Sequence, residues 1–594
     1  MEKADSQSSQ DGTENVEHAP RRGSFANMDN LAAVFENPLK QRTKDELLKD
    51  VGEFCRMHDL MDYHDDFRKG ALAAQSPESI HMLEELTPED KNIIERELTH
   101  RWSHPFMLYW LCCMCSMAAA VQGMDETVNN GAQALYLADL DIAGPGVTRF
   151  SPSMQDNITG LVVGAPYLCC AILGCWLTEP LNKVLGRRGT IFISCFIAAV
   201  ASIWEGVANS WVNLFLARFV LGLGIGPKSS TVPVYAAECS PAPIRGALVM
   251  QWQMWTAFGI MLGNIMGVAF GPSTGIKPSL GWRLMLGSTV VLPLIVCAQV
   301  YFCPESPRWY IQHKKVKKAF RSFQRLRYSN IQAARDTYYT YVGVEIEREA
   351  NRGKNLFTQF VELFTVPRNR RATWATWILM FGQQFCGVNI IAYYSTTIFI
   401  ESGYSTNSAL LASMGTGILN FVFAIPAVFT IDRWGRRNLL LFTFPFLCLF
   451  LLWTGMSFFI PDDGTKKRVG MVTTEAFPVH VRDVGMSWAT ATTWCFNFIL
   501  SFTWPSISRA FTVQGAFGWY AAWCAILWVF ILLFVPETKA LTLEELDQVF
   551  GVSTRKHMSY QMKNAMWHFR TWVLRQKLEP LPPFYRRAER LNHK

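Results

Sequence analysis

The sequence lacks the residue clusters from which most enzyme active sites are built. Its fifteen cysteines show no metal-ligand spacing with histidine, and most lie inside apolar segments. Small buried hydrophobic residues are a simpler interpretation of such cysteines than disulfides or metal ligands. No nucleophile–base constellation is present, and the glycine-rich run at residues 222–226 lies in an apolar segment and follows no strand, so it is no phosphate loop. We therefore expect no enzyme, no metal site and no cofactor.

The chain also lacks an apolar segment at its start. The first hundred residues are polar, so we expect no cleavable signal peptide, and the first apolar span must serve as the insertion signal. Residues 1–30 are rich in Ser, Gln, Asp and Asn, which predicts disorder. The run Thr87-Pro88-Glu89-Asp90 is typical of a helix N-terminus with a capping box, and it predicts a short cytosolic helix.

What the chain does contain is a series of long apolar runs. Half of its residues are hydrophobic, and they collect in runs of about 20, the length that crosses a hydrocarbon core of roughly 30 Å. The predicted spans are 104–125, 158–178, 190–209, 212–231, 247–270 and 284–303, followed by 373–400, 408–430, 438–460, 486–509 and 516–536. The pattern predicts an all-α polytopic membrane protein. Small residues at 222–226 would let neighbouring helices approach closely.

The placement of the basic residues indicates which side of the membrane each loop faces. Fifteen Lys and Arg stand against six Asp and Glu over residues 304–371, whereas residues 126–156 hold one base and four acids. By the positive-inside rule, the first stretch is cytosolic and the second is exterior. The net charge of +8 therefore reflects topology rather than nucleic-acid binding, and we expect no nucleic-acid partner.

Three motifs occur twice, in the same order and each at the end of a span. The repeated motifs are Gly186-Arg187-Arg188 with Gly435-Arg436-Arg437, Glu238-x-x-Pro241-x-x-x-Arg245 with Glu475-x-x-Pro478-x-x-x-Arg482, and Pro304-Glu305-Ser306-Pro307-Arg308 with Pro536-Glu537-Thr538-Lys539. Such a repeat predicts two duplicated halves.

The second half is one span short. Gly186 and Glu238 are 52 residues apart and enclose two spans, whereas the 40 residues from Gly435 to Glu475 have room for one. Only two spans then remain to bring the chain back to a cytosolic, basic tail at 551–594, and an odd number is required. We infer that one helix has been lost near Val472 and Thr473, by mis-splicing or a wrong gene model. A natural variant with a membrane-dipping segment is the alternative.

With these motifs the chain resembles the sugar porter family of the major facilitator superfamily, over about residues 100–550. Within that family it is similar to fungal proton-coupled permeases of sugars and polyols, with the myo-inositol branch as a candidate. The motifs that carry the resemblance are Leu185-Gly186-Arg187-Arg188, Arg218 with Gly222, Gly224 and Gly226, Pro233-x-Tyr235-x-x-Glu238-x-x-Pro241-x-x-x-Arg245-Gly246, Pro304-Glu305-Ser306-Pro307-Arg308, Gln383-Gln384-x-x-Gly387-x-Asn389, Asp432-Arg433-x-Gly435-Arg436-Arg437 and Pro536-Glu537-Thr538-Lys539.

The resemblance implies the major facilitator fold of two pseudo-repeated helix bundles, here with eleven spans and the tenth family helix missing. The expected organisation is an N-terminal cytosolic tail (1–100), a six-helix bundle (101–303), a basic cytosolic linker with short helices (304–372), a C-terminal bundle one span short (373–537) and a basic cytosolic tail (538–594). We expect a monomeric, multi-pass protein of the plasma membrane, with both tails cytosolic in the intact twelve-helix form. One departure from the family pattern is Asn182, which stands where an acid is common.

Ionisable groups inside apolar spans are functional candidates, because placing a charge there costs about 2.5–3.5 kcal/mol on insertion scales. Two stand out: Asp125, at the end of the first predicted span, and Arg218, within the fourth. The family's proton-coupled members carry an Asp and an Arg at these positions, which implies that the pair couples proton uptake to the conformational change. The alternatives are an exterior helix cap for Asp125 and a snorkelling side chain for Arg218.

A sugar or polyol presents neutral hydroxyl groups, which amides bind well because they donate and accept at once. The resemblance implies six amide ligands: Gln253, Gln383, Gln384, Asn389, Asn420 and Asn497. Gln384 and Asn389 would lie about 140° apart on a straight helix, so we expect unwinding near Gly387. The alternative is that these amides only form hydrogen bonds between helices.

The resemblance also implies that paired Arg and Glu residues at the cytosolic helix ends form a gating network that closes that side. Its candidate members are Gly186, Arg187, Arg188, Glu238, Arg245, Glu305, Arg308, Asp432, Arg436, Arg437, Glu475, Arg482 and Glu537. Basic flanks that only set the topology are the alternative. That alternative does not account for Glu238 and Glu475, which stand at matched offsets from Pro and Arg.

Together these features predict proton symport of a hexose, disaccharide or myo-inositol across the lipid bilayer, by alternating access. Two alternatives stay open. One is a sensor that binds sugar without transporting it, and the other is an inactive product that lacks one helix.

Overall fold

The computed structural model describes residues 39–40, 42–76, 80–100, 102–144, 147–241, 243–350, 352–353, 356–434, 436–457, 483–536, 554–576 and 579, and all regular structure within them is helical. The first bundle consists of α4 (Phe106–Asp139), α5 (Pro152–Cys169), the π-helical turn η4 (Cys170–Gly174), α6 (Cys175–Gly206), α7 (Trp211–Cys239), α8 (Arg245–Ala269), α9 (Pro278–Ser288) and α10 (Val291–Val300). The second consists of α15 (Pro367–Phe385), α16 (Val388–Glu401), α17 (Thr406–Trp434), α18 (Arg436–Ser457) and α19 (Asp483–Phe534).

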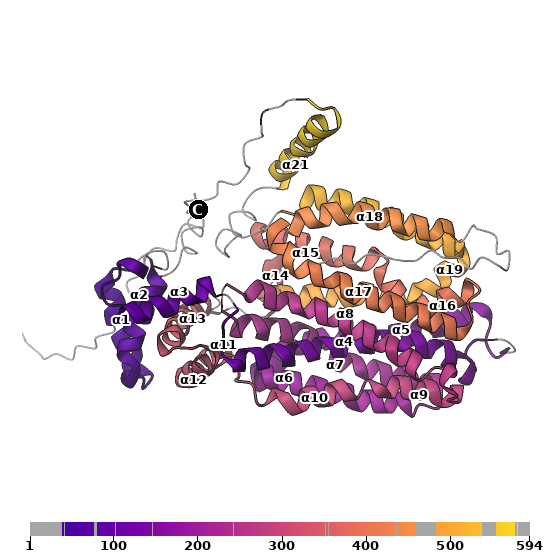
Figure 1. The fold of residues 1–594 in the computed structure, drawn as a ribbon, viewed down its shortest axis with the longest axis horizontal. Helices are drawn as coiled ribbons and strands as arrows, with labels where there is room; N and C mark the ends of the chain where they lie inside the picture. Colours follow the sequence, from indigo (N-terminus) through magenta and orange to yellow (C-terminus); the bar gives the residue numbers. More distant parts are fainter. Residues whose placement is uncertain are drawn as a thin grey trace, which may run out of the picture.

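The remaining helices lie outside the two bundles. They are α1 (Lys44–Met57), α2 (His64–Gln75), α3 (Pro88–Thr99), α11 (Pro307–Gln312), α12 (Val316–Leu326), α13 (Asn330–Ala350), α14 (Leu356–Thr365) and α21 (Thr554–His568), with short turns at η2 (Met61–Tyr63), η3 (Ile80–Met82), η5 (Pro272–Thr274) and η6 (Phe569–Val573). Figure 1 shows the long helices running side by side, with α1–α3 and α11–α13 gathered at one end of the molecule.

The two bundles are packed against each other along their length. Within the first, α4 packs against α8 and α6 against α7, and within the second, α18 packs against α19. Helices α8 and α17, and likewise α5 and α19, are in contact across the boundary between the bundles. In Figure 1 the first bundle lies below the second. The arrangement is the pseudo-repeated pair of bundles that the sequence predicts.

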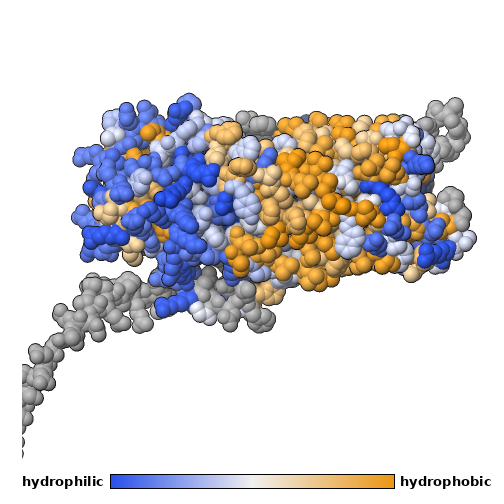
Figure 2. Space-filling view, turned by 90° about the horizontal axis from the view of Figure 1, so that it is seen from below, coloured by the Kyte–Doolittle hydropathy of each residue, from blue (hydrophilic) through white to orange (hydrophobic). Residues whose placement is uncertain are grey.

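Among the described residues, most helices of the two bundles belong to segments that are long and apolar enough to cross a membrane. Seven continuous segments meet this criterion: Phe106–Asp139, Pro152–Gly206, Pro278–Val300, Asn369–Glu401, Thr406–Pro426, Arg437–Met456 and Thr490–Phe534. The segments starting at Pro152 and Thr490 each hold two predicted spans. Figure 2 shows a broad apolar belt over the helical bundles and polar residues at the end occupied by α1–α3. Large apolar side chains of α6, such as Phe196 and Ile203, are exposed, as expected of a surface that faces lipid.

The predicted end of the first span, at residue 125, is wrong. Helix α4 continues to Asp139, so Asp125 lies inside the helix rather than at its terminus, and an exterior cap is not its role. Hydropathy ends the span too early because the residues after it are polar but buried within the protein, among them Asn129, Asn130 and Gln133. A polar side chain that faces another helix does not meet the lipid.

The glycine run at 222–226 lies where α7 crosses its neighbours. A Cβ at Gly222 would lie 2.3 Å from the carbonyl oxygen of Pro166 in α5, and one at Gly224 would lie 2.6 Å from that of Ser194 in α6. At Gly226 it would lie 2.6 Å from the carbonyl carbon of Gly174 in η4. No larger residue fits at these crossings, which confirms the predicted close approach of helices.

Helices α1–α3 form a cap over the linker helices α12 and α13. Apolar residues of α1 and α2, such as Phe54 and Phe67, share one buried cluster with Phe320 of α12 and Tyr338 of α13. The predicted capping box at the start of α3 is confirmed, since Thr87 and Asp90 bind each other's backbone N–H groups.

Part of the predicted pattern lies outside the described residues. These parts are the stretch 458–482 that contains the inferred loss of a helix, together with Gly435, Glu475, Arg482 and Glu537 and the side chains of Asp432 and Arg436. Every other predicted span falls on a described helix or helix pair.

Candidate functional site

The seventh predicted span is broken at Gly387, as expected. This glycine has a φ of +80° between α15 and α16, and a Cβ there would lie 3.0 Å from the Tyr520 side chain. The break brings two candidate ligands together, because Asn389 Nδ2 donates a hydrogen bond to Gln384 Oε1 at 2.7 Å. On an unbroken helix these amides would point apart. Gln383 precedes Gln384 and is half-buried.

Beside this break, aromatic rings connect the two bundles. Tyr167 of α5 stacks on Trp494 of α19, with ring centroids 5.5 Å apart, and on Tyr393 of α16, at 5.3 Å. Asn497 Nδ2 donates to the hydroxyl oxygen of Tyr393 at 2.9 Å, and Trp494 Nε1 donates to Ser229 Oγ of α7 at 3.4 Å. The candidate ligand Asn497 therefore belongs to a mixed aromatic and amide cluster between the bundles.

Two candidate ligands lie on another pair of helices. Gln253 is half-buried on α8, and Asn420 is half-buried on α17, the helix of the second bundle that packs against α8. Asn420 Oδ1 is buried and has no hydrogen-bond partner among the described residues. An amide oxygen in that position can accept a hydroxyl hydrogen from a ligand. Neither side chain has a described hydrogen bond to the Gln384–Asn389 pair.

The candidate proton-coupling residues do not form the expected direct pair. Arg218 is 1% exposed, lies 3.7 Å from Glu205 Oε2 and donates to the carbonyl oxygens of Val162 and Val163. Asp125 is also buried, and among the described residues neither of its carboxylate oxygens has a hydrogen-bond partner. Glu205 of α6 is thus the acid that pairs with Arg218, and Asp125 can still accept a proton or bind another cation.

Sequence reasoning missed two buried charges in the first bundle. Glu205 and Lys228 lie inside α6 and α7, and both are almost completely buried. The signal was present in the sequence, because each is an ionisable residue inside a predicted apolar span.

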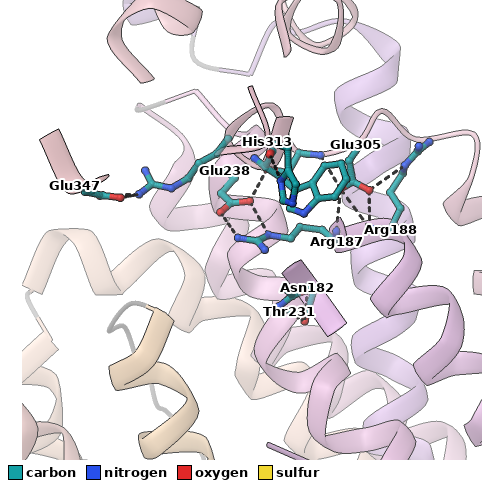
Figure 3. A network of polar contacts seen from close by, with 11 residues as sticks. Asn182, Arg187, Arg188, Thr231, Glu238, Glu305, His313 and Glu347 are labelled. Atoms are coloured by element: carbon teal, nitrogen blue, oxygen red, sulfur yellow. Dashed lines mark hydrogen bonds and ion pairs between the residues drawn. The ribbon is translucent and has the colours of Figure 1, made fainter. Parts of the chain in front are cut away.

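At the end of the first bundle that lies beside the linker helices, ion pairs connect three segments (Figure 3). Arg187 donates from Nε and Nη2 to both carboxylate oxygens of Glu238, at 3.1 and 2.9 Å. Ser306 Oγ donates to the same carboxylate at 2.6 Å. Glu305 accepts from the backbone N–H groups of Arg187 and Arg188 and pairs with the Arg188 side chain at 3.4 Å. These contacts join α6 to α7 and to the start of the linker.

Gly186 makes this network possible. Its φ of +76° separates the two predicted spans within the long segment, and a Cβ there would lie 2.6 Å from Glu305 Oε2. A side chain would therefore displace the Glu305 carboxylate from the backbone N–H groups it binds.

Three other candidate members of the network make contacts of their own. Arg308 pairs with Glu347 of α13, and Arg245 Nη2 lies 3.5 Å from the carbonyl oxygen of Ser240. Asn182, at the position where an acid is common, exchanges hydrogen bonds with Thr231. Arg437, in the second bundle, donates to the Leu532 carbonyl and to Gln561 of α21. The first-bundle half of the network is thus assembled, and most of its second-bundle half lies outside the described residues.

Polar contacts also join the bundles at the end remote from the cap. Asn130 Nδ2 of α4 donates to Ser395 Oγ of α16 at 2.7 Å, and its Oδ1 accepts from the Thr396 N–H at 3.0 Å. Arg509 of α19 pairs with Asp156 of α5 at 2.7 Å. These contacts close the remote end between α4, α5, α16 and α19.

Comparisons with known proteins agree with this arrangement. The profile of the family described as "Sugar (and other) transporter" matches residues 111–474 and 464–550. Myo-inositol transporter 1 of Cryptococcus neoformans is 30% identical, covering 75% of this chain and 83% of that protein, and myo-inositol transporter FST1 of Gibberella moniliformis is 28% identical, covering 79% and 85%.

Among solved structures, the proton:xylose symporter XylE, bound to 6-bromo-6-deoxy-D-glucose, has the same fold. It is 24% identical, with a TM-score of 0.61 over 75% of this chain and 99% of that one. The fold, the repeated motifs and the family match lead to one conclusion: the chain is an integral membrane protein that belongs to the sugar (and other) transporter family.

Proposed function

We propose that this protein carries a sugar or polyol across a membrane by alternating access, with myo-inositol as the first substrate to test. The observation that carries the proposal is the amide and aromatic cluster at the break between α15 and α16, because it draws its side chains from both bundles. A ligand held there would be released to either side as the bundles rock.

The chemistry of the cluster suits a neutral polyhydroxyl ligand. Gln384, Asn389 and Asn497 supply donors and acceptors that can bind hydroxyl groups in either direction. The stacked rings of Tyr167, Tyr393 and Trp494 supply flat apolar surfaces for C–H groups. The two curated myo-inositol transporters support a polyol as substrate.

We further propose that transport is coupled to protons through Asp125. This carboxyl group is buried in α4 without a described hydrogen-bond partner, so its charge is costly and a proton removes it. The cytosolic network around Arg187 and Glu238 would hold that side together in one state of the cycle. We place the protein in the plasma membrane as a monomer, with both tails in the cytosol.

Uptake of labelled myo-inositol tests the proposal, in cells that lack their own transporter and express the chain with the inferred lost helix restored. All transport tests of this protein use that form. We expect accumulation that grows with an inward proton gradient, and a loss of at least about ten-fold for Gln384→Ala or Asn497→Ala, since each removes a hydrogen bond that no other group replaces. The matched control is Asn213→Ala near the start of α7. Its side-chain Oδ1 accepts a hydrogen bond from Trp204 Nε1, and its backbone N–H, which the substitution keeps, donates to the cap residue Ser210. Unaltered uptake in both site variants would contradict the proposed ligands.

Proton coupling has its own test. Proton coupling is overturned if uptake does not depend on the pH gradient and if Asp125→Asn takes up as much substrate as the unaltered protein. A cellular response to sugar while labelled sugar stays outside would favour the sensor instead, but the relatives matched over most of their length are transporters.

A further inference from the structure

Lys228 is a second buried cation whose role neither the family resemblance nor the network explains. It lies in the interior of α7, its side chain is 0% exposed, and among the described residues its Nζ has no hydrogen-bond partner. An ammonium group has three donors and no acceptor, and burying it unpaired in a bilayer costs several kcal/mol. A lysine in this place needs an anion that it can reach.

The groups around Lys228 come from four elements. Lys228 lies on α7, which packs against α4, α5, α6 and η4. Asp125 of α4 and Cys170 of η4 are near enough for its charge to act on them. Glu126 of α4 also lies near Cys170, and its carboxylate accepts a hydrogen bond from Gln122. Asp125 is therefore the acid in this group whose two oxygens have no described hydrogen bond.

Arg218 is less suited than Lys228 to be the counter-charge of the Asp125 carboxylate. Its guanidinium already pairs with Glu205 and donates to two carbonyl oxygens of α5. Arg218 and Lys228 are ten residues apart on α7, which corresponds to about 15 Å along the helix axis. Lys228 lies nearer than Arg218 to the end of α7, where Glu238 pairs with Arg187.

We propose that Lys228 is the positioning residue that receives the Asp125 carboxylate after proton release toward the cytosol. The inference rests on the proposed proton-coupled transport. In this step the carboxyl O–H bond breaks, the proton passes to water on the capped side, and the ammonium keeps its three N–H bonds and becomes the counter-charge. Arg218 and Glu205 remain paired throughout. Lys228 thereby stabilises the deprotonated, cytosol-facing state.

A double-mutant cycle on the purified full-length chain tests the pair without requiring transport. We expect Asp125→Asn and Lys228→Met each to lower the Tm by about 5 °C at a pH at which Asp125 is deprotonated, because each then leaves the other buried group charged and without a counter-charge. The double variant, which removes both charges, is expected to be no less stable than either single variant. Lys183→Met is the control, since Lys183 is exposed and pairs within its own helix. Additive losses in the double variant would overturn the pairing.

A transport measurement tests the role. For Lys228→Met we expect the ratio of gradient-driven myo-inositol accumulation to myo-inositol exchange to fall by about ten-fold or more, since exchange needs no net proton release. Lys228→Arg, which keeps the charge, is expected to restore most of that ratio. An unchanged ratio in Lys228→Met would overturn the role. If the unaltered protein ignores the proton gradient, proton coupling fails, and the stability cycle still decides whether Lys228 and Asp125 interact.

Discussion

Arg187 illustrates how one side chain ties several segments together at the residue scale. It sits at a helix start, is largely buried, and binds both oxygens of Glu238 while its own N–H binds Glu305. Bidentate geometry strengthens such a pair, and burial removes the screening that weakens exposed ion pairs. The buried contact is costly to form but much more costly to break by removing one partner.

Replacing Glu238 by Gln is expected to destabilise the protein by about 3 kcal/mol, because Arg187 keeps its charge in a buried place without a counter-charge. Thermal unfolding in detergent measures the change. Glu179→Gln is the control: its partner Lys183 is exposed and on the same helix, so the expected change is below about 0.5 kcal/mol. Equal changes in stability for the two substitutions would show that the buried pair contributes no more than the exposed one.

His557 makes the docking of α21 sensitive to pH. Burial, and secondarily the Arg437 charge, lower the pKa of His557 from 6.5 to about 4. A histidine whose pKa is lower in the docked state weakens docking as the pH falls below 6.5, and the effect levels off near pH 4. We expect faster amide hydrogen exchange in α21 at pH 5 than at pH 7, after correction for intrinsic rates. His557→Gln should remove this difference, and a persistent difference would assign it to another group.

At the scale of elements, the cap and the linker form one interlocked unit. Arg335 of α13 reaches Glu97 of α3 at 2.9 Å and also pairs with its neighbour Asp336. Burial opposes ionisation of Asp336, but Arg335 and Arg327 outweigh it and hold the pKa of this carboxyl below its usual range. Arg327 in turn donates to the Cys239 carbonyl at the end of α7, so the cap is connected to the first bundle.

Gly70 is the closest point of this interface. A Cβ at Gly70 would lie 2.7 Å from the backbone nitrogen of Arg335, and backbone cannot move aside as a flexible side chain can. We therefore expect Gly70→Val to loosen α1–α3, seen as increased hydrogen exchange there, while the exchange of α6 and α7 stays unchanged. Gly52→Val is the control, since a Cβ at Gly52 meets only the end of a side chain, at 3.8 Å. Similar exchange in the two variants would contradict a tight cap.

At the scale of the whole molecule, the two halves are unequal. The second bundle has one predicted span fewer than the first, and the family profile matches as two segments that meet at residues 464–474, where we infer a lost helix. The loss of a helix at this place stays a prediction from the sequence.

We predict that the messenger across Val472 and Thr473 contains about 25 additional in-frame codons for an apolar segment rich in Gly and Pro. Sequencing that junction is the measurement. Restoring the segment is expected to return the C-terminal tail to the cytosolic side and to raise transport from near background. If the junction is genuine, the side of the tail is in question, and we expect little transport from this form.

Much of this architecture was predictable because the bilayer imposes strong rules on the sequence. Apolar runs, basic loops and repeated motifs predicted the helices, the two bundles and the break at Gly387, where the unwound glycine brings Gln384 to Asn389. The end of α4 was not predictable from hydropathy, because Asn129 and Asn130 are polar yet face other helices. The pairing of charges was not predictable either, because it depends on which helices become neighbours.

The sequence by itself determined that this protein crosses a membrane, that its halves repeat and that its family handles sugars, because each follows from local composition and motif order. Only the tertiary structure decided which charges meet. It placed Arg218 with Glu205 and left Asp125 and Lys228 available, and it set Tyr167 of one bundle against Trp494 of the other. These contacts join residues on separate helices, and the packing of small residues at helix crossings determines which side chains come into range.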